Sequence, residues 1–192
     1  MSEITKHYDN GNIQARYTTI NDKLNGLCET WWSNGNKHTE CIYVDDKRHG
    51  LCQIWYSDGN QCKKCTFSDG EYDGFYQTWW SNGNKKIECT YVKGECHGLY
   101  QSWWSDGNKE IKCMYENGRL KGLYQRWWSN GNMELKCNFS NQLEGLYQRW
   151  YCDGTEEMEC TFADGRYHGS YKRWNENGSI FGECTYTNGK EI

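Results

Sequence analysis

Large apolar side chains alternate with polar ones over short segments of the chain. Residues 87–91 (Ile-Glu-Cys-Thr-Tyr) form one such segment, and residues 99–104 (Leu-Tyr-Gln-Ser-Trp-Trp) form another. Alternation with a period of two is typical of a half-buried β-strand, and no segment shows the sustained 3.6-residue period of a helix. Asn-Gly and Asp-Gly pairs separate many of the segments, and they are strong signals for a hairpin turn. The pattern therefore predicts an all-β chain of short antiparallel strands.

The segments recur with a nearly constant period. A glycine opens each unit, and successive glycines lie 24 residues apart except for one step of 23. Each unit then carries a tryptophan, a second aromatic residue, an Asn-Gly or Asp-Gly turn, a cysteine and a further aromatic residue. The second aromatic position holds Trp or Tyr in every unit except the last, which has Asn175. Linked columns of this kind indicate a repeat protein in which each unit packs on its neighbours.

We therefore predict a single repeat domain over residues 1–192. Its fold class is all-β, an elongated single-layer antiparallel meander of about fifteen strands built from 24-residue β-hairpin repeats. A partial repeat occupies residues 8–25, and full repeats start at residues 26, 50, 74, 98, 122, 145 and 169. Adjacent aromatics such as Trp103 and Trp104 should point to opposite faces of the sheet. We expect Gly98 to make room for a neighbouring ring on the core face.

One stretch is similar to a known family. Residues 115–127 read Tyr-Glu-Asn-Gly-Arg-Leu-Lys-Gly-Leu-Tyr-Gln-Arg-Trp, which closely resembles a MORN repeat. The Trp-x-x-Asn/Asp-Gly continuation looks like the MORN variant often named as a bacterial antitoxin component and also abundant in large DNA viruses. The resemblance covers about residues 8–190 and implies a single-layer, non-enzymatic protein of hairpins. It further implies roles in protein scaffolding, self-association or phospholipid binding.

The chain departs from that family in its second tryptophan and in its cysteine column. Members of this column lie two strands apart, about 9.6 Å, whereas a disulfide needs Cα atoms within about 7 Å. Cys28 and Cys52 only replace tyrosine in a neighbouring column. The N-terminus has no signal-peptide core, so we predict a reducing, cytoplasmic location and twelve free thiols. We expect no metal and no cofactor.

Charge and motif content exclude several functions. The formal net charge is −4, whereas a nucleic-acid footprint or an anionic-lipid site should be basic. No stretch is long and apolar enough to span a membrane. Three of the five histidines precede the glycine of a unit, which is a turn position, and no nucleophile or carboxylate recurs beside them. We therefore predict that the protein is not an enzyme and that it does not bind nucleic acid, and the charge disfavours association with membranes.

The first tryptophan of each unit is the candidate site. Either both aromatic columns only stabilise the sheet, or one column forms an exposed binding surface, because contiguous exposed aromatic residues mark interaction sites. The candidate surface consists of Trp31, Trp55, Trp79, Trp103, Trp127, Trp150 and Trp174. The leading interpretation is a protein–protein interaction scaffold, or a module that self-associates through open sheet edges. The alternatives are an antitoxin that neutralises a partner toxin, and an aromatic ladder that binds a small ligand or phospholipid.

Overall fold

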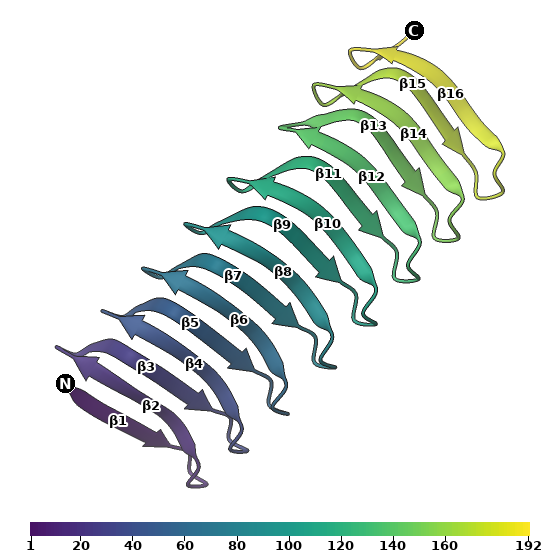
Figure 1. The fold of residues 1–192 in the computed structure, drawn as a ribbon. Helices are drawn as coiled ribbons and strands as arrows, with labels where there is room; N and C mark the ends of the chain where they lie inside the picture. Colours follow the sequence, from purple (N-terminus) through teal and green to yellow (C-terminus); the bar gives the residue numbers. More distant parts are fainter. The chain divides into compact units, whose positions relative to one another are not determined.

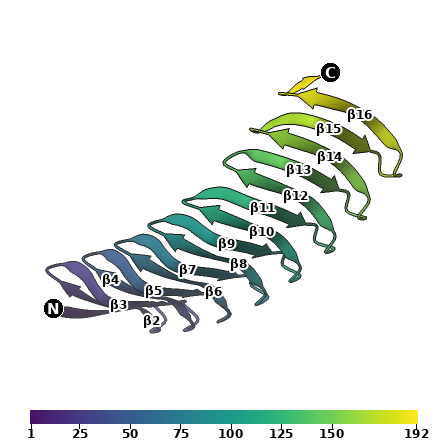
Figure 2. The same ribbon diagram turned by 45° about the horizontal axis from the view of Figure 1, so that its top comes forward.

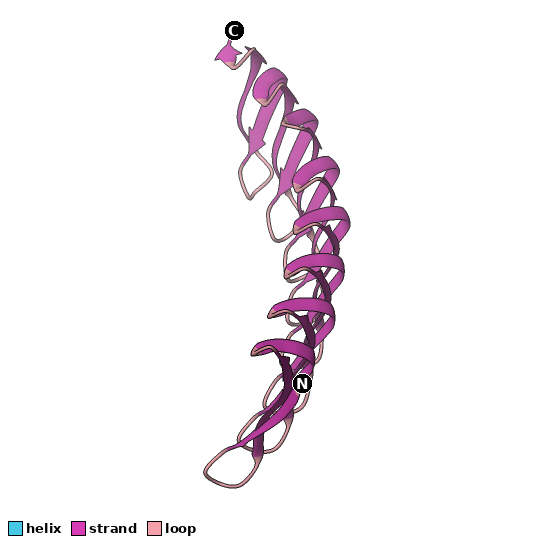
Figure 3. Ribbon diagram, turned by 90° about the vertical axis from the view of Figure 1, so that its left-hand side faces the viewer, coloured by secondary structure: helices cyan, strands magenta, loops and turns pink.

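The computed structural model describes the whole chain, Met1–Ile192, and consists only of strands and loops (Figure 3). The all-β prediction is confirmed, with seventeen strands in place of about fifteen. The first eight are β1 (Ser2–His7), β2 (Ile13–Ile20), β3 (Lys23–Trp31), β4 (Lys37–Val44), β5 (Lys47–Trp55), β6 (Gln61–Ser68), β7 (Glu71–Trp79) and β8 (Lys85–Val92). The others are β9 (Glu95–Trp103), β10 (Lys109–Glu116), β11 (Arg119–Trp127), β12 (Met133–Ser140), β13 (Leu143–Trp150), β14 (Glu156–Ala163), β15 (Arg166–Trp174), β16 (Ile180–Thr187) and β17 (Lys190–Glu191).

The contacts divide the chain into two compact units, Met1–Glu95 and Cys96–Ile192. In the first unit, β1 to β8 follow one another in chain order, and each pairs antiparallel with its neighbour. In the second unit, β9 to β17 follow the same rule. Figures 1 and 2 show the strands of each unit side by side, with most of them bent into arcs. The predicted antiparallel meander is confirmed in both units.

The strand count exceeds the prediction at β1 and β17. β1 precedes the partial repeat, carries none of the repeat columns, and exposes every side chain except Ile4 to a large extent. It is a strand because it pairs with β2 from Ser2↔Thr19 to His7↔Ile13. β17 contains only two residues, which pair with the end of β16. Backbone pairing alone forms these two strands, so a pattern of buried side chains does not reveal them.

The core lies on one side of each unit, which we call the Cys face. Its buried apolar residues are Cys41, Cys52, Cys65, Phe67, Cys89, Cys113, Cys137 and Cys160. Aromatic rings cover the thiols: the ring centroids of Tyr100 and Tyr115 are 5.8 Å apart, and those of Tyr147 and Phe162 are 5.7 Å apart. Burial raises the pKa of Cys113 to about 12 and that of Cys137 to about 11. These thiols are therefore protonated at neutral pH and act as small apolar core residues.

The glycine that opens each repeat has a different role from the one predicted. A Cβ added to Gly98 or to Gly122 would meet nothing within 4 Å, so these glycines do not make room for a neighbouring ring. Their φ angles are instead positive, 80° and 73°. In the first unit, Gly50 lies between Arg48, which faces Tyr43, and Cys52, which faces Cys41, where the β4–β5 register shifts and marks a bulge. Glycine is needed there because other residues rarely adopt positive φ.

No helix in the structure has the length and apolar character needed to cross a bilayer.

Candidate interaction face

The seven candidate tryptophans occupy equivalent positions. Each is the last residue of a strand: β3, β5 and β7 in the first unit, and β9, β11, β13 and β15 in the second. All seven are half-buried. Side chains alternate along β3, so Trp31 shares one side with Leu27 and Glu29, and Cys28 lies on the other. We call the side of each unit that carries these tryptophans the Trp face.

Cations lie over the tryptophans at one end of the first unit. The guanidinium of Arg16 is 5.5 Å from the Trp31 ring, and the ammonium of Lys37 is 5.9 Å from the rings of both Trp31 and Trp55. Glu29 accepts hydrogen bonds from Arg16 Nε at 3.0 Å and from Lys37 Nζ at 2.8 Å. Burial acts to raise the pKa of Glu29, but the bonds from Lys37 and Arg16 outweigh it, so the pKa is lowered. The buried carboxylate thus holds two cations against the tryptophan rings.

The second aromatic of each repeat links that repeat to the next one. In the first unit, the Trp32 indole N–H donates to the backbone carbonyl of Trp55 at 3.1 Å, and the Tyr56 hydroxyl donates to that of Trp79 at 2.9 Å. In the second unit, Trp104 donates to the Trp127 carbonyl at 3.0 Å. Trp and Tyr exchange freely in this column because both carry a donor at the tip of a ring. The second aromatic column is therefore structural.

Asparagines in the turns form a second set of links. Asn34 Nδ2 and Asn36 Nδ2 donate to the carbonyl oxygen of Ser57 at 2.7 and 2.9 Å. In the second unit, Asn108 Nδ2 donates to the carbonyl of Ser129 at 2.7 Å. Each turn thereby bonds to the equivalent turn one repeat later. The frequent asparagines at these turns are explained by this contact as well as by turn geometry.

Replacing Tyr56 by phenylalanine tests the aromatic link. The substitution keeps the ring and removes only the hydroxyl that donates to the Trp79 carbonyl. We expect the free energy of unfolding to fall by about 1 kcal/mol, the usual net value of one hydrogen bond. Urea denaturation followed by tryptophan fluorescence measures the change. Tyr43→Phe is the control, because the Tyr43 hydroxyl only accepts a 3.4 Å bond from exposed Arg48, and its loss should change stability by less than about 0.5 kcal/mol.

An exposed apolar row on the Trp face was not predicted from the sequence. In the second unit, Leu99, Met114, Leu123 and Leu146 are 43%, 44%, 40% and 43% exposed. Leu99 and Met114 lie directly opposite each other on β9 and β10. In the first unit, the exposed members are Leu27, Ile42 and Phe75. A leucine or phenylalanine follows most of the repeat glycines, and this column in the sequence could have predicted the row.

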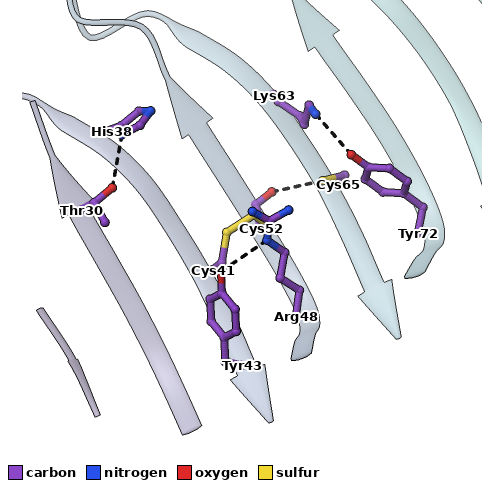
Figure 4. The surroundings of a disulfide bond; sticks show 9 residues. All are labelled: Thr30, His38, Cys41, Tyr43, Arg48, Cys52, Lys63, Cys65 and Tyr72. Carbon is purple, nitrogen blue, oxygen red and sulfur yellow. Dashed lines mark hydrogen bonds between the residues drawn. A yellow bond between two sulfur atoms is a disulfide. The ribbon is translucent and has the colours of Figure 1, made fainter. Parts of the chain in front are cut away.

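The prediction of twelve free thiols is wrong. The structure contains a disulfide between Cys41 on β4 and Cys52 on β5, with Cα atoms 4.1 Å apart (Figure 4). Members of the cysteine column are two strands apart, so no pair within the column can bond. Cys52 belongs to the neighbouring column and lies on the strand next to Cys41, where the register sets the two residues directly opposite each other. No cluster of histidine, cysteine or acidic side chains forms a metal site.

Comparison with known families supports the resemblance seen in the repeats. The family model described as a MORN repeat variant matches residues 97–117, 120–141 and 167–188, all in the second unit. The recognition made from residues 115–127 is thereby confirmed for these repeats. Repeats of this kind are generally protein- or membrane-interaction modules. Comparison with curated proteins gives no match.

Proposed function

We propose that the chain is a non-catalytic scaffold that binds a partner protein through its Trp face. The family match supports an interaction module in general terms. The net charge of −4 favours a protein partner over an anionic membrane surface, which basic patches recognise.

The exposed apolar row of the second unit carries this proposal. Leu99, Met114, Leu123 and Leu146 lie on the surface of the Trp face, each at least 40% exposed. These side chains lie outside the buried apolar core, which is on the Cys face. Leu99, Met114 and Leu123 lie on successive strands, whereas exposed Asn138 on β12 separates Leu123 from Leu146. Exposed apolar residues grouped beside polar ones mark protein-binding surfaces, and half-buried tryptophans supply the aromatic anchors that interfaces favour.

The experiment changes the apolar row without disturbing the core. A triple variant, Leu99→Thr, Leu123→Thr and Leu146→Thr, places β-branched residues, which strands favour, at these positions while removing the apolar surface. The tagged variant and the wild-type chain are used to capture partners from an extract of the native source, with mass spectrometry as the readout. We expect the wild type to retain a specific protein and the variant to retain at least about tenfold less, in line with the loss of several interface contacts.

The control is a double variant, Ile180→Thr and Phe181→Thr. Ile180 and Phe181 are apolar and even more exposed; Ile180 is opposite Trp174, three strands beyond Leu146, so this variant tests whether loss of any exposed apolar pair, or loss of the row itself, releases the partner. This variant should retain the partner as the wild type does, and circular dichroism should show that both variants are folded. Equal retention by the folded triple variant, or recovery of the chain alone from the wild type, contradicts the proposal. A retained toxin would narrow the function to that of an antitoxin.

A further inference from the structure

Four cysteines lie in one line across four consecutive strands of the first unit. Cys28 on β3 is directly opposite Cys41 on β4, Cys41 is opposite Cys52 on β5, and Cys52 is opposite Cys65 on β6. We call these four residues the cysteine row. Figure 4 shows three of them, with the Cys41–Cys52 disulfide next to the free Cys65 thiol. The Cys41–Cys52 disulfide therefore lies between two free thiols of the row, those of Cys28 and Cys65.

The spacing of the row permits each neighbouring pair to bond. The Cα atoms of Cys41 and Cys52 are 4.1 Å apart, which matches the close, non-hydrogen-bonded type of antiparallel pair. A residue that is non-hydrogen-bonded toward one neighbouring strand is hydrogen-bonded toward the other, where Cα atoms are about 5.5 Å apart. This expected spacing places Cys28–Cys41 and Cys52–Cys65 inside the usual disulfide range of about 4.4–6.8 Å, whereas the Cys41–Cys52 pair lies just below it.

Only one end of the row is open to solvent. Cys41, Cys52 and Cys65 are 0%, 1% and 0% exposed. The Cys65 thiol donates to the Cys52 carbonyl at 3.8 Å and lies deep in the core cluster. Cys28 is half-buried and lines an open pocket of about 470 Å³, together with Ile4, Tyr17 and Leu24. A small molecule in this pocket would meet the sulfur of Cys28 and none of the other three.

We propose that the cysteine row is a thiol–disulfide exchange site, in which Cys28 reacts with a low-molecular-weight thiol in the pocket and connects it to the buried Cys41–Cys52 bond. This proposal is independent of partner binding by the Trp face. The pocket and the row lie on the Cys face, and the exposed apolar row lies on the opposite side of the strands.

The exchange proceeds in balanced steps. The Cys28 thiolate attacks Cys41 Sγ, a Cys28–Cys41 bond forms, and Cys52 leaves as a thiolate that takes up the proton released from Cys28. The register sets Cys28, Cys41 and Cys52 in one line on adjacent strands, so Cys28 would approach Cys41 from the side opposite to Cys52, as exchange requires. A monothiol then attacks Cys28 Sγ and frees Cys41 as a thiol. A second monothiol removes the first as its own disulfide, so two monothiols are oxidised and one protein disulfide is reduced.

Exchange through Cys28 should be slow near neutral pH. Burial raises the pKa of Cys28, and the Glu29 carboxylate raises it further, against an opposing effect of Arg48. Tyr17, Asp22 and Glu29 are the other titratable groups at the pocket or beside Cys28. Because the thiolate is the attacking species, the rate should increase with pH up to the raised pKa of Cys28.

The test measures how fast a monothiol reduces the buried bond. Protein purified without reductant is treated with glutathione, quenched with acid, alkylated and mapped by mass spectrometry for the Cys41–Cys52 peptide pair. We expect Cys28→Ser to slow the loss of this bond by roughly tenfold or more, since the remaining sulfurs of the row are buried. Cys62→Ser is the matched control, because Cys62 is also free and half-buried on β6 but lies outside the row. It should react as the wild type does.

A second variant tests the migration of the bond directly. In Cys52→Ser, the displaced partner is absent, so we expect oxidised glutathione to produce a Cys28–Cys41 disulfide. Reduction of Cys28→Ser at the wild-type rate overturns the proposal. So does a Cys52→Ser protein in which Cys28 and Cys41 both remain alkylatable, or a wild-type protein that forms no disulfide within the row under oxidised glutathione. Circular dichroism on each variant confirms that the sheet is intact.

Discussion

Gly74→Ala is expected to lower the free energy of unfolding by about 3 kcal/mol. Gly74 has a φ angle of 99°, where an L-residue is strained by about 1–3 kcal/mol. A Cβ at this position would also collide with the hydroxyl oxygen of Thr66, which donates a hydrogen bond to the carbonyl of Asp73. The collision breaks that bond or shifts the strand, and either adds to the conformational strain. Urea denaturation monitored by circular dichroism measures the loss.

Two further glycines separate the strain from the collision. Gly122 has a positive φ of 73° but nothing within 4 Å of an added Cβ, so Gly122→Ala should cost only the strain, about 1–2 kcal/mol. Gly182 lies in a strand without positive φ and without close neighbours, so Gly182→Ala should be neutral or slightly stabilising. If all three substitutions have equal effects, the conformational account of the repeat glycine is wrong.

Glu29→Gln is expected to destabilise the protein by about 2 kcal/mol at pH 7. Glu29 is only 7% exposed and accepts charged hydrogen bonds from Arg16 and Lys37, each of which is worth more than a neutral bond. The estimate stays modest because Arg16 is 46% exposed and water screens its charge. Loss of the carboxylate also leaves two cations facing each other near Trp31.

The effect of Glu29→Gln should disappear in acid. The folded protein holds the pKa of Glu29 below its unfolded value of about 4.3. The carboxylate therefore contributes fully above that pH, and its contribution is lost as the pH falls through the folded pKa. Unfolding curves of wild type and variant from pH 7 to pH 3 should converge. Glu88→Gln is the control: Glu88 is bonded to Lys85 at 3.0 Å but is 37% exposed, so it should cost less than about 1 kcal/mol. A difference that persists unchanged at pH 3 would refute the ion-pair explanation.

The repeat columns predicted the architecture because each column has one structural cause. The alternation in residues 87–91 places Cys89 and Tyr91 on the core face, and the structure has β8 at Lys85–Val92. The strands at either end escaped prediction, since β1 and β17 carry no column. The glycine column was predicted correctly as a position, but its cause is backbone conformation and not the room required by a ring. A sequence carries no dihedral angles, so it could not distinguish a positive φ from the need for room beside a ring.

The candidate site was predicted less completely than the fold. Periodicity located the tryptophan column, but it could not show that Arg16 and Lys37 lie over Trp31 or that the leucine row is exposed. Those facts depend on register across strands. The same limit explains the missed disulfide: Cys41 and Cys52 belong to different columns, and the bulge between Cys41 and Tyr43 decides which residue faces Cys41. Whether the tryptophan column binds a partner stays a prediction.

The hydrogen bonds from side chains to backbone carbonyls between repeats run in one direction along the chain, so each repeat differs in what it offers to the repeat before it and the repeat after it. Side chains of one repeat donate to backbone carbonyls of the repeat that follows, as Tyr151 does to Trp174. Asn175 stands where the next such donor would be, and its amide turns back to Ser179 in its own turn at 2.9 Å. Internal repeats can therefore be duplicated or deleted in whole units without losing a bond. A copy of the Asn175 repeat inserted upstream would leave the tryptophan carbonyl of the following repeat without this donor.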